Sequence, residues 1–163
     1  GYRVTGMAAS GVSAGGTLAM NLAYGGNSAI PVRFVFELAA PTYFVAEDWG
    51  SLMKSDNLGS EEEFYRMMTG KELSAQEYRQ EIKKISPTCL VGEDSVPTLI
   101  GYGLKDHCVP ADQKEYLIDA LEKNGVSYDY VEFPHSNHLL YGDLDKMQTF
   151  MDLSLEYCEK YFQ

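Results

Sequence analysis

Short apolar runs alternate along this chain with longer amphipathic stretches, which limits it to folds in which helices pack on a sheet. The runs cover residues 4–10, 32–38, 98–103 and 128–133, and the helical stretches cover about 14–24, 111–123 and 144–161. Gly25 and Gly26 end the first helical stretch, whereas Pro110 precedes the second. We therefore predict one α/β domain built on a mostly parallel sheet of about four strands.

The last helical stretch carries apolar side chains at steps of three and four residues. They are Leu144, Met147, Met151, Leu155 and Cys158. Because such residues share one face of a helix, we predict that this face lies on the sheet.

Composition excludes several classes of protein. Lys and Arg total 13 against 24 Asp and Glu, so the formal net charge of −11 disfavours a nucleic-acid partner. The sequence contains no apolar run long enough to span a membrane. The three cysteines, Cys89, Cys108 and Cys158, lack metal-ligand spacing, so we expect neither a zinc site nor a disulfide framework, but buried or incidental thiols.

Residues 45–87 separate the second and third apolar runs and are too long for an ordinary connection. Two capping boxes, Ser60 to Glu63 and Ser74 to Glu77, predict helices in this segment. We expect a helical cap over a site, with a decorated crossover as the alternative. The aromatic and methionine side chains of residues 43–87 would suit an apolar substrate group, although ordinary packing explains the same residues. They are Phe44, Trp49, Phe64, Tyr65, Met67 and Met68.

Residues 11–15 read Gly-Val-Ser-Ala-Gly and fit the pattern G-x-S-x-G between an apolar run and a helix. In that context Ser13 is lifted above the strand ends on a tight turn, and we expect a side chain at either glycine, Gly11 or Gly15, to collide with backbone. The helix would point its N-terminus at developing negative charge. The alternative is that Ser13 only caps the helix.

A nucleophilic serine needs a base, and the base needs an orienting acid. Asp106 follows the third apolar run, with Asp112 and Asp94 as alternatives. His138 follows the fourth run, with His135 and His107 as alternatives. The chain order Ser, Asp, His is that of α/β-hydrolases.

Three segments together resemble the α/β-hydrolases of the esterase and lipase type. They are Gly-Val-Ser-Ala-Gly-Gly at 11–16, Gly-Leu-Lys-Asp-His-Cys-Val-Pro at 103–110 and Phe-Pro-His-Ser-Asn-His at 133–138. The resemblance extends over nearly the whole chain and implies an α/β-hydrolase fold. It also implies that Ser13 is the nucleophile, Asp106 the acid and His138 the base, with no metal or organic cofactor.

The chain departs from this family ahead of Ser13, where the family places several strands and a loop that donates to the oxyanion. Ala14 supplies one backbone N–H, and the sequence offers no second donor, whose loss costs about 10²–10³ in kcat. We therefore expect part of a longer hydrolase. Its first strand would be an exposed sheet edge, which favours a homodimer.

The expected activity is hydrolysis of a small-molecule carboxylic ester through an acyl-enzyme, by an esterase, a lipase or a carbohydrate esterase. A serine peptidase of the prolyl-oligopeptidase type has the same residue order and is an alternative. The other alternative is an inactive structural fragment without a complete oxyanion hole.

Overall fold

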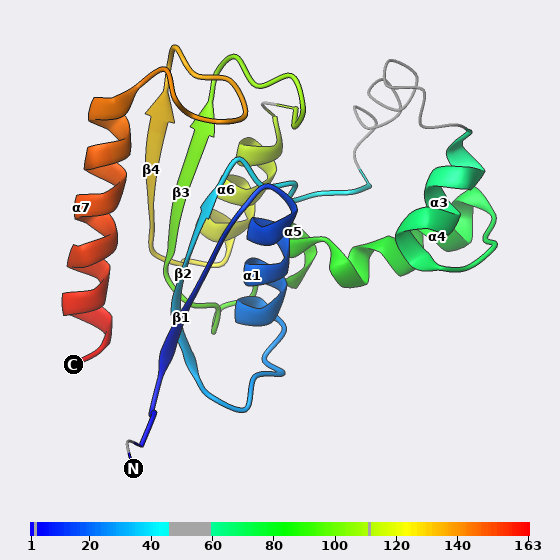
Figure 1. The fold of residues 1–163 in the computed structure, drawn as a ribbon. Coiled ribbons are helices and arrows are strands. Elements are labelled where there is room, and N and C mark those ends of the chain that lie inside the picture. The colour runs from blue at the N-terminus through cyan, green and yellow to red at the C-terminus, as the bar shows by residue number, and fades with distance from the viewer. Residues whose placement is uncertain (2, 46–59, 111) are drawn as a thin grey trace.

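Four strands form one parallel sheet in the order β1-β2-β3-β4 (Figure 1). The computed structural model describes residues 1, 3–45, 60–110 and 112–163. Its strands are β1 (Met7–Val12), β2 (Val32–Leu38), β3 (Thr98–Gly103) and β4 (Tyr128–Phe133). The predicted parallel α/β sheet is thus confirmed. The first strand covers residues 7–12, whereas its apolar run covers residues 4–10, because residues 7–12 are those that pair with β2.

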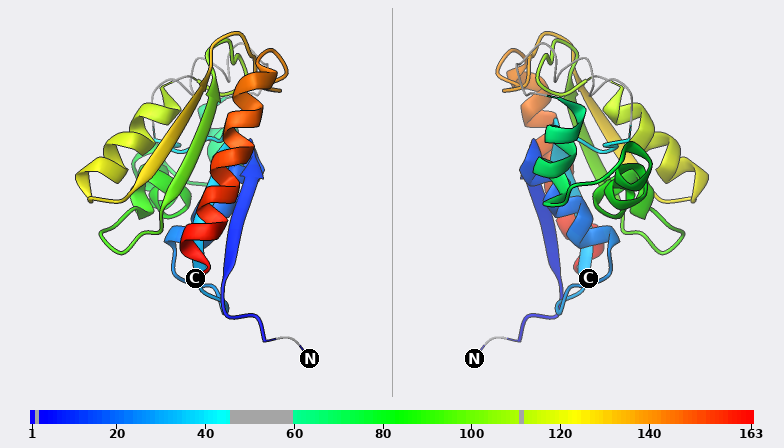
Figure 2. Two further views of the ribbon diagram at one scale, coloured as in Figure 1. Left: turned by 90° about the vertical axis from the view of Figure 1, so that its left-hand side faces the viewer. Right: turned by 90° about the vertical axis from the view of Figure 1, so that its right-hand side faces the viewer.

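Helices cover both faces of the sheet (Figures 1 and 2). Helices α1 (Ala14–Tyr24) and α6 (Gln113–Lys123) lie on one face, and α7 (Leu144–Tyr161) lies on the other. The bounds of α1 and α7 agree with the sequence pattern, whereas α6 begins two residues later than residue 111. Each parallel crossover is therefore long enough to carry a helix, as parallel pairing requires.

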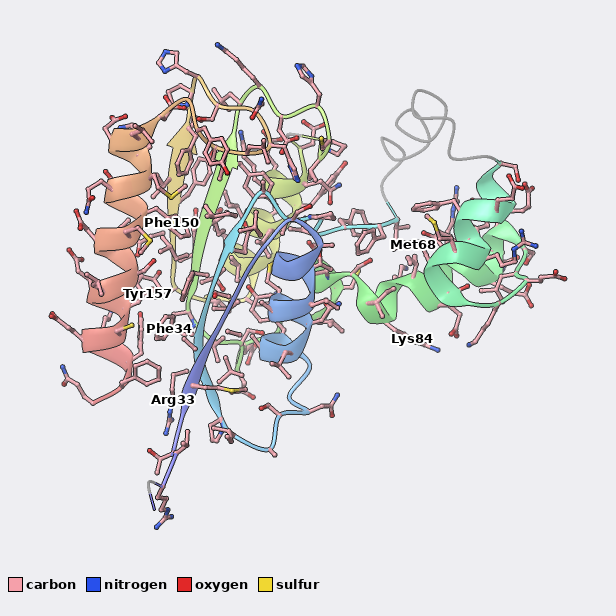
Figure 3. All side chains as sticks on the ribbon, in the orientation of Figure 1. Arg33, Phe34, Met68, Lys84, Phe150 and Tyr157 are labelled. Carbon is pink, nitrogen blue, oxygen red and sulfur yellow. The ribbon has the colours of Figure 1, made fainter. Side chains whose placement is uncertain are left out.

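Each face of the sheet has its own buried core. On the α1 and α6 side the core is Ala9, Ala19, Met20, Val35, Ala40, Ile100, Tyr102, Val109, Leu117, Leu121 and Val126. On the α7 side it is Phe34, Leu99, Val131, Phe133, Leu140, Phe150 and Tyr157. Figure 3 labels Phe34, Phe150 and Tyr157 between α7 and the strands, and the rings of Phe34 and Tyr157 are in edge contact. The sheet is therefore buried on both sides, as parallel sheets are.

The predicted buried face of α7 was right only in part: Met147 and Cys158 pack against the core on the sheet, but the other three residues do not. Leu144, Met151 and Leu155 are 75%, 52% and 62% exposed, whereas Phe150 and Tyr157 are buried. The aromatic side chains offer more apolar area, and Phe34 and Phe36 of β2 receive them in ring contacts. The helix is thus rotated away from the stripe of aliphatic residues.

The segment between β2 and β3 holds α3 (Glu61–Thr69), α4 (Ala75–Glu81), the 3₁₀ helix η1 (Ile82–Ile85) and α5 (Pro87–Leu90). Both predicted capping boxes are present, at Ser60 with Glu63 and at Ser74 with Glu77. Helices α3 and α4 project away from the sheet (Figure 1) around a separate small core of Phe64, Tyr65, Tyr78 and Ile82. Trp49 lies outside the described residues.

None of the helices in the described ranges is long and apolar enough to cross a bilayer. Among the described strands, β1 has a neighbour on one side only, as expected for the first strand. Its other edge leaves backbone donors and acceptors without a strand partner.

Candidate active site

The carboxyl ends of the four strands meet at one edge of the sheet, where ligands bind in open α/β folds. Three connections leave this edge: the turn after β1, and, on the other side of β2, the adjacent loops after β3 and β4. They carry Ser13, Asp106 and His138 respectively. Parallel pairing therefore gathers residues that lie far apart in the chain.

Ser13 occupies a strained turn between β1 and α1, with φ 54° and ψ −131°. Its N–H donates to the Leu38 carbonyl at 2.8 Å, which ties the turn to β2. A Cβ at Gly11 would lie 2.2 Å from the backbone carbon of Gly15, so position 11 admits only glycine without a backbone shift. The turn therefore depends on this close approach.

The expectation for the second glycine of the motif was wrong. A Cβ at Gly15 would meet nothing within 4 Å. The constrained neighbour is Gly16, where a Cβ would lie 2.6 Å from the Cβ of Ala40. Gly16 thus allows α1 to pack closely on the turn that follows β2.

The acid loop after β3 encloses the carboxylate of Asp106. Its Oδ1 accepts backbone N–H groups from Cys108 at 2.7 Å and Val109 at 3.0 Å. The side chain is fully buried, so these donors replace water around the charge. The alternatives lie elsewhere: Asp112 precedes α6 at its N-cap, and Asp94 is exposed.

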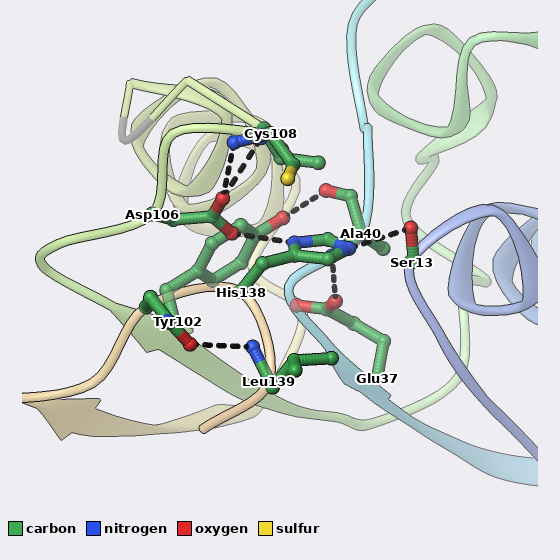
Figure 4. A network of polar contacts seen from close by, with 10 residues as sticks. Ser13, Glu37, Ala40, Tyr102, Asp106, Cys108, His138 and Leu139 are labelled. Carbon is green, nitrogen blue, oxygen red and sulfur yellow. Dashed lines mark hydrogen bonds and ion pairs between the residues drawn. The ribbon is translucent and has the colours of Figure 1, made fainter. Parts of the chain in front are cut away.

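His138 joins the three connections into one hydrogen-bonded chain (Figure 4). Its Nδ1 lies 2.7 Å from Oδ2 of Asp106, and its Nε2 lies 2.9 Å from Oγ of Ser13. The ring is 18% exposed. Of the sequence candidates, the structure therefore brings Ser13, Asp106 and His138 together, while His107 is exposed and His135 pairs with Asp143.

The loop that carries His138 is stapled by a second carboxylate, Asp143. Its oxygens accept the backbone N–H of His135 at 2.9 Å, pair with His135 Nδ1 at 2.7 Å and accept the Ser136 hydroxyl at 2.6 Å. Desolvation opposes ionisation of Asp143, but the hydrogen bonds from Ser136 and His135 hold its pKa below the usual value. The sequence analysis missed this residue, because nothing in its spacing marks the contact.

Glu37 and Tyr102 hold the turn after β2 beside the site (Figure 4). Oε2 of Glu37 accepts the Ala40 N–H at 2.9 Å, and the Tyr102 hydroxyl donates to the Ala40 carbonyl. Glu37 is fully buried, its Oε1 has no hydrogen-bond partner among the described residues, and burial raises its pKa well above the usual value. The signal for Glu37 in the sequence was a charged residue near the end of a mostly apolar run, residues 32–38, in which Arg33 is the other charged residue.

Three metal-binding side chains converge on the acid loop, which the cysteine spacing did not predict. Ligand atoms of Asp106, Cys108 and His138 all lie within 4.8 Å of one another. Cys108 and Cys89 are exposed free thiols, so of the two expected alternatives, buried or incidental, burial does not apply to them. Cys158 is partly buried.

Comparison with known proteins places this geometry in a family. The model of the prolyl oligopeptidase family matches residues 3–163. No curated protein sequence matches the chain significantly.

Solved structures share the fold. A truncated carbohydrate esterase from gut microbiota is 19% identical with a TM-score of 0.68, over 94% of this chain and 59% of its own. An esterase from the planctomycete Thermogutta terrifontis is 22% identical with a TM-score of 0.66, over 94% of this chain and 55% of its own.

An acylaminoacyl peptidase from Pyrococcus horikoshii is 16% identical with a TM-score of 0.68, over 98% of this chain and 24% of its own. The chain thus spans little more than half the length of these esterases and about a quarter of the peptidase. The fold is that of the α/β-hydrolases, and the chain belongs to the prolyl oligopeptidase family of serine hydrolases.

Proposed function

We propose that this chain carries the catalytic triad of a serine hydrolase that cleaves carboxylic esters. The observation that carries the proposal is the hydrogen-bonded chain from Ser13 through His138 to Asp106, with both contacts below 3 Å. Such a chain lets a neutral imidazole take the serine proton while a carboxylate holds its tautomer.

The proposed mechanism has two halves. His138 Nε2 accepts the Ser13 proton as Oγ attacks the ester carbonyl, and the resulting imidazolium protonates the departing alcohol. The same nitrogen then activates water, which releases the acid from Ser13. Asp106 holds Nδ1 throughout, and its two backbone donors keep the carboxylate in place.

The tetrahedral oxyanion would form beside the first turn of α1. Ala14 is the first residue of α1, and helix geometry leaves its N–H without a partner inside the helix. Among the described residues we identify no second N–H donor for the oxyanion. We propose that residues 45–87 cap the site and that the segment upstream of β1 in a longer protein completes the oxyanion hole.

The first test is labelling with a fluorophosphonate, followed by mass spectrometry of the modified peptide. We expect phosphonylation of Ser13, its loss in Ser13→Ala and its retention in Ser10→Ala, which alters an exposed serine nearby on β1. Hydrolysis of p-nitrophenyl acetate should fall by about four to six orders of magnitude in Ser13→Ala. A folded wild-type chain that resists the probe would contradict the proposal and favour an inactive fragment.

The second candidate is peptide-bond hydrolysis, which the match to the prolyl oligopeptidase family favours. The triad chemistry is the same, but the leaving group is an amine. Measuring kcat/KM for acetyl esters and for acetylated aminoacyl anilides distinguishes ester hydrolysis from peptide-bond hydrolysis. A higher kcat/KM for the anilides would overturn ester hydrolysis as the main activity.

A further inference from the structure

The acid loop places a thiol against the catalytic pair. Asp106 and Cys108 come from the loop after β3, and His138 comes from the loop after β4. Their oxygen, sulfur and nitrogen atoms lie within 4.8 Å of one another. Figure 4 shows the Cys108 sulfur on the side of the His138 ring that faces Asp106. The thiol is exposed, so a solute can reach it.

This trio of atoms matches the ligands of a soft divalent cation. Zinc takes thiolate, imidazole and carboxylate at about 2.0–2.3 Å, so atoms around one ion lie roughly 3–4 Å apart. Asp106 Oδ2 and His138 Nδ1 are 2.7 Å apart and would have to separate by a few tenths of an ångström to hold one ion between them. No atom of the trio lies more than 4.8 Å from another, so the exposed Cys108 side chain needs to approach by about an ångström or less. The carboxylate of Asp106 is held through Oδ1 by the backbone N–H groups of Cys108 and Val109, which leaves Oδ2 to bind the ion.

We propose that Asp106, Cys108 and His138 form an inhibitory binding site for a soft divalent cation such as Zn²⁺. The proposal rests on the proposed function for its effect on activity, although not for the binding itself. The metal occupies Nδ1 of His138 and so replaces the hydrogen bond to Asp106.

Binding is balanced by the release of one proton. The Cys108 thiol loses its proton to solvent, Asp106 is already a carboxylate, and the imidazole proton moves from Nδ1 to Nε2. A protonated Nε2 cannot accept the Ser13 proton, so the nucleophile is no longer activated.

The binding test uses Co²⁺ as a spectroscopic substitute and needs no activity. We expect a thiolate-to-cobalt charge-transfer absorption in the wild-type chain, its loss in Cys108→Ser and its retention in Cys89→Ser, the other exposed thiol. Circular dichroism of each variant confirms folding. No absorption in the folded wild type, or an equal one in Cys108→Ser, would overturn the site.

The inhibition test measures the rate of fluorophosphonate labelling of Ser13 as a function of zinc concentration. The rate of each protein is divided by its own rate without zinc. The zinc concentration for half-inhibition should be at least about tenfold higher in Cys108→Ser than in the wild type. Tenfold is the lower limit because even residues that only hydrogen-bond to metal ligands change metal affinity by about 10–100-fold. A chelator should restore labelling. Equal inhibition of both variants contradicts the proposal. A wild type unlabelled without zinc refutes the proposed function instead, while the cobalt spectrum still decides the site.

Discussion

Glu37 links the stability of the protein to pH, because burial keeps its carboxyl group neutral. In the unfolded chain the group ionises near its ordinary pKa of 4.5, whereas its folded pKa is raised well above that value by desolvation. Its contribution is complete below the unfolded pKa and is lost as pH rises toward the folded pKa.

We predict that the free energy of unfolding of Glu37→Gln, measured relative to wild type, is greater at pH 8 than at pH 5. The amide still accepts the Ala40 N–H but has no proton to lose. Urea midpoints of both proteins at the two pH values test this, with Glu132→Gln on the exposed face of β4 as the control. An equal difference between Glu37→Gln and wild type at both pH values would count against a neutral Glu37.

The two glycines of the Ser13 turn should respond differently to the same added methyl group. Gly11→Ala forces a Cβ into the backbone of Gly15 and should cost more than about 3 kcal/mol, the upper end for overpacking. Gly15→Ala enters open space in a helix and should be neutral or stabilising by up to about 1 kcal/mol. Thermal unfolding of the two variants gives the comparison, and similar losses would contradict the turn geometry.

Asp143 acts on the site by positioning the loop that carries His138. We expect Asp143→Asn to slow fluorophosphonate labelling on the order of 10–100-fold, since a misplaced base lowers the rate far more than it lowers binding. KM for p-nitrophenyl acetate should change little, which distinguishes positioning from general loss of folded protein. Asp145→Asn, an exposed neighbour, is the control, and an equal effect of the two substitutions would refute this role.

At the scale of elements, α7 shows how the choice of a buried face depends on its partner. Phe150→Ala should lower the free energy of unfolding by about 3–5 kcal/mol, because the ring lies buried against Phe36. Leu155→Ala, at a position 62% exposed, should change it by less than about 0.5 kcal/mol. Chemical denaturation measures both, and the reverse order would restore the aliphatic stripe as the buried face.

The elements themselves were largely predictable because their signals are local. The runs at 32–38, 98–103 and 128–133 became strands with the predicted bounds, and both capping boxes formed. The start of β1 was misplaced, since the beginning of a strand is set by where its partner lies and not by its own apolar residues. The same reason explains the face of α7.

At the scale of the whole molecule, β1 has one edge without a strand partner among the described strands. Exposed apolar side chains occur on β1 and on the helix that follows it: Val12, Leu18 and Leu22 are 54%, 70% and 41% exposed. An unpaired strand and exposed apolar side chains both favour association. We propose that a second copy of this chain pairs along this edge.

Sedimentation velocity across micromolar concentrations should show a dimer that Leu18→Glu disrupts. Met67→Glu, at an exposed position on α3 away from the sheet, should leave the dimer intact. A wild-type chain that stays monomeric throughout would contradict the self-association. Upstream residues of a longer protein would then be the occupant to test next.

Local chemistry was enough to identify the α/β pattern, the glycine turn around Ser13 and the order of serine, acid and histidine. The pattern and the turn depend on neighbours within a few residues, and the order of the three residue types can be read along the chain without knowing their contacts. The contact of His138 with Ser13 spans 125 residues, and its partner Asp106 lies 32 residues away. The burial of Glu37 in the sheet and the approach of Cys108 to His138 likewise depend on tertiary packing. The contacts of Asp143 with His135 and Ser136 depend on how the connection between β4 and α7 folds back on itself. Packing in three dimensions sets which side chains share a desolvated edge, and no local pattern records it.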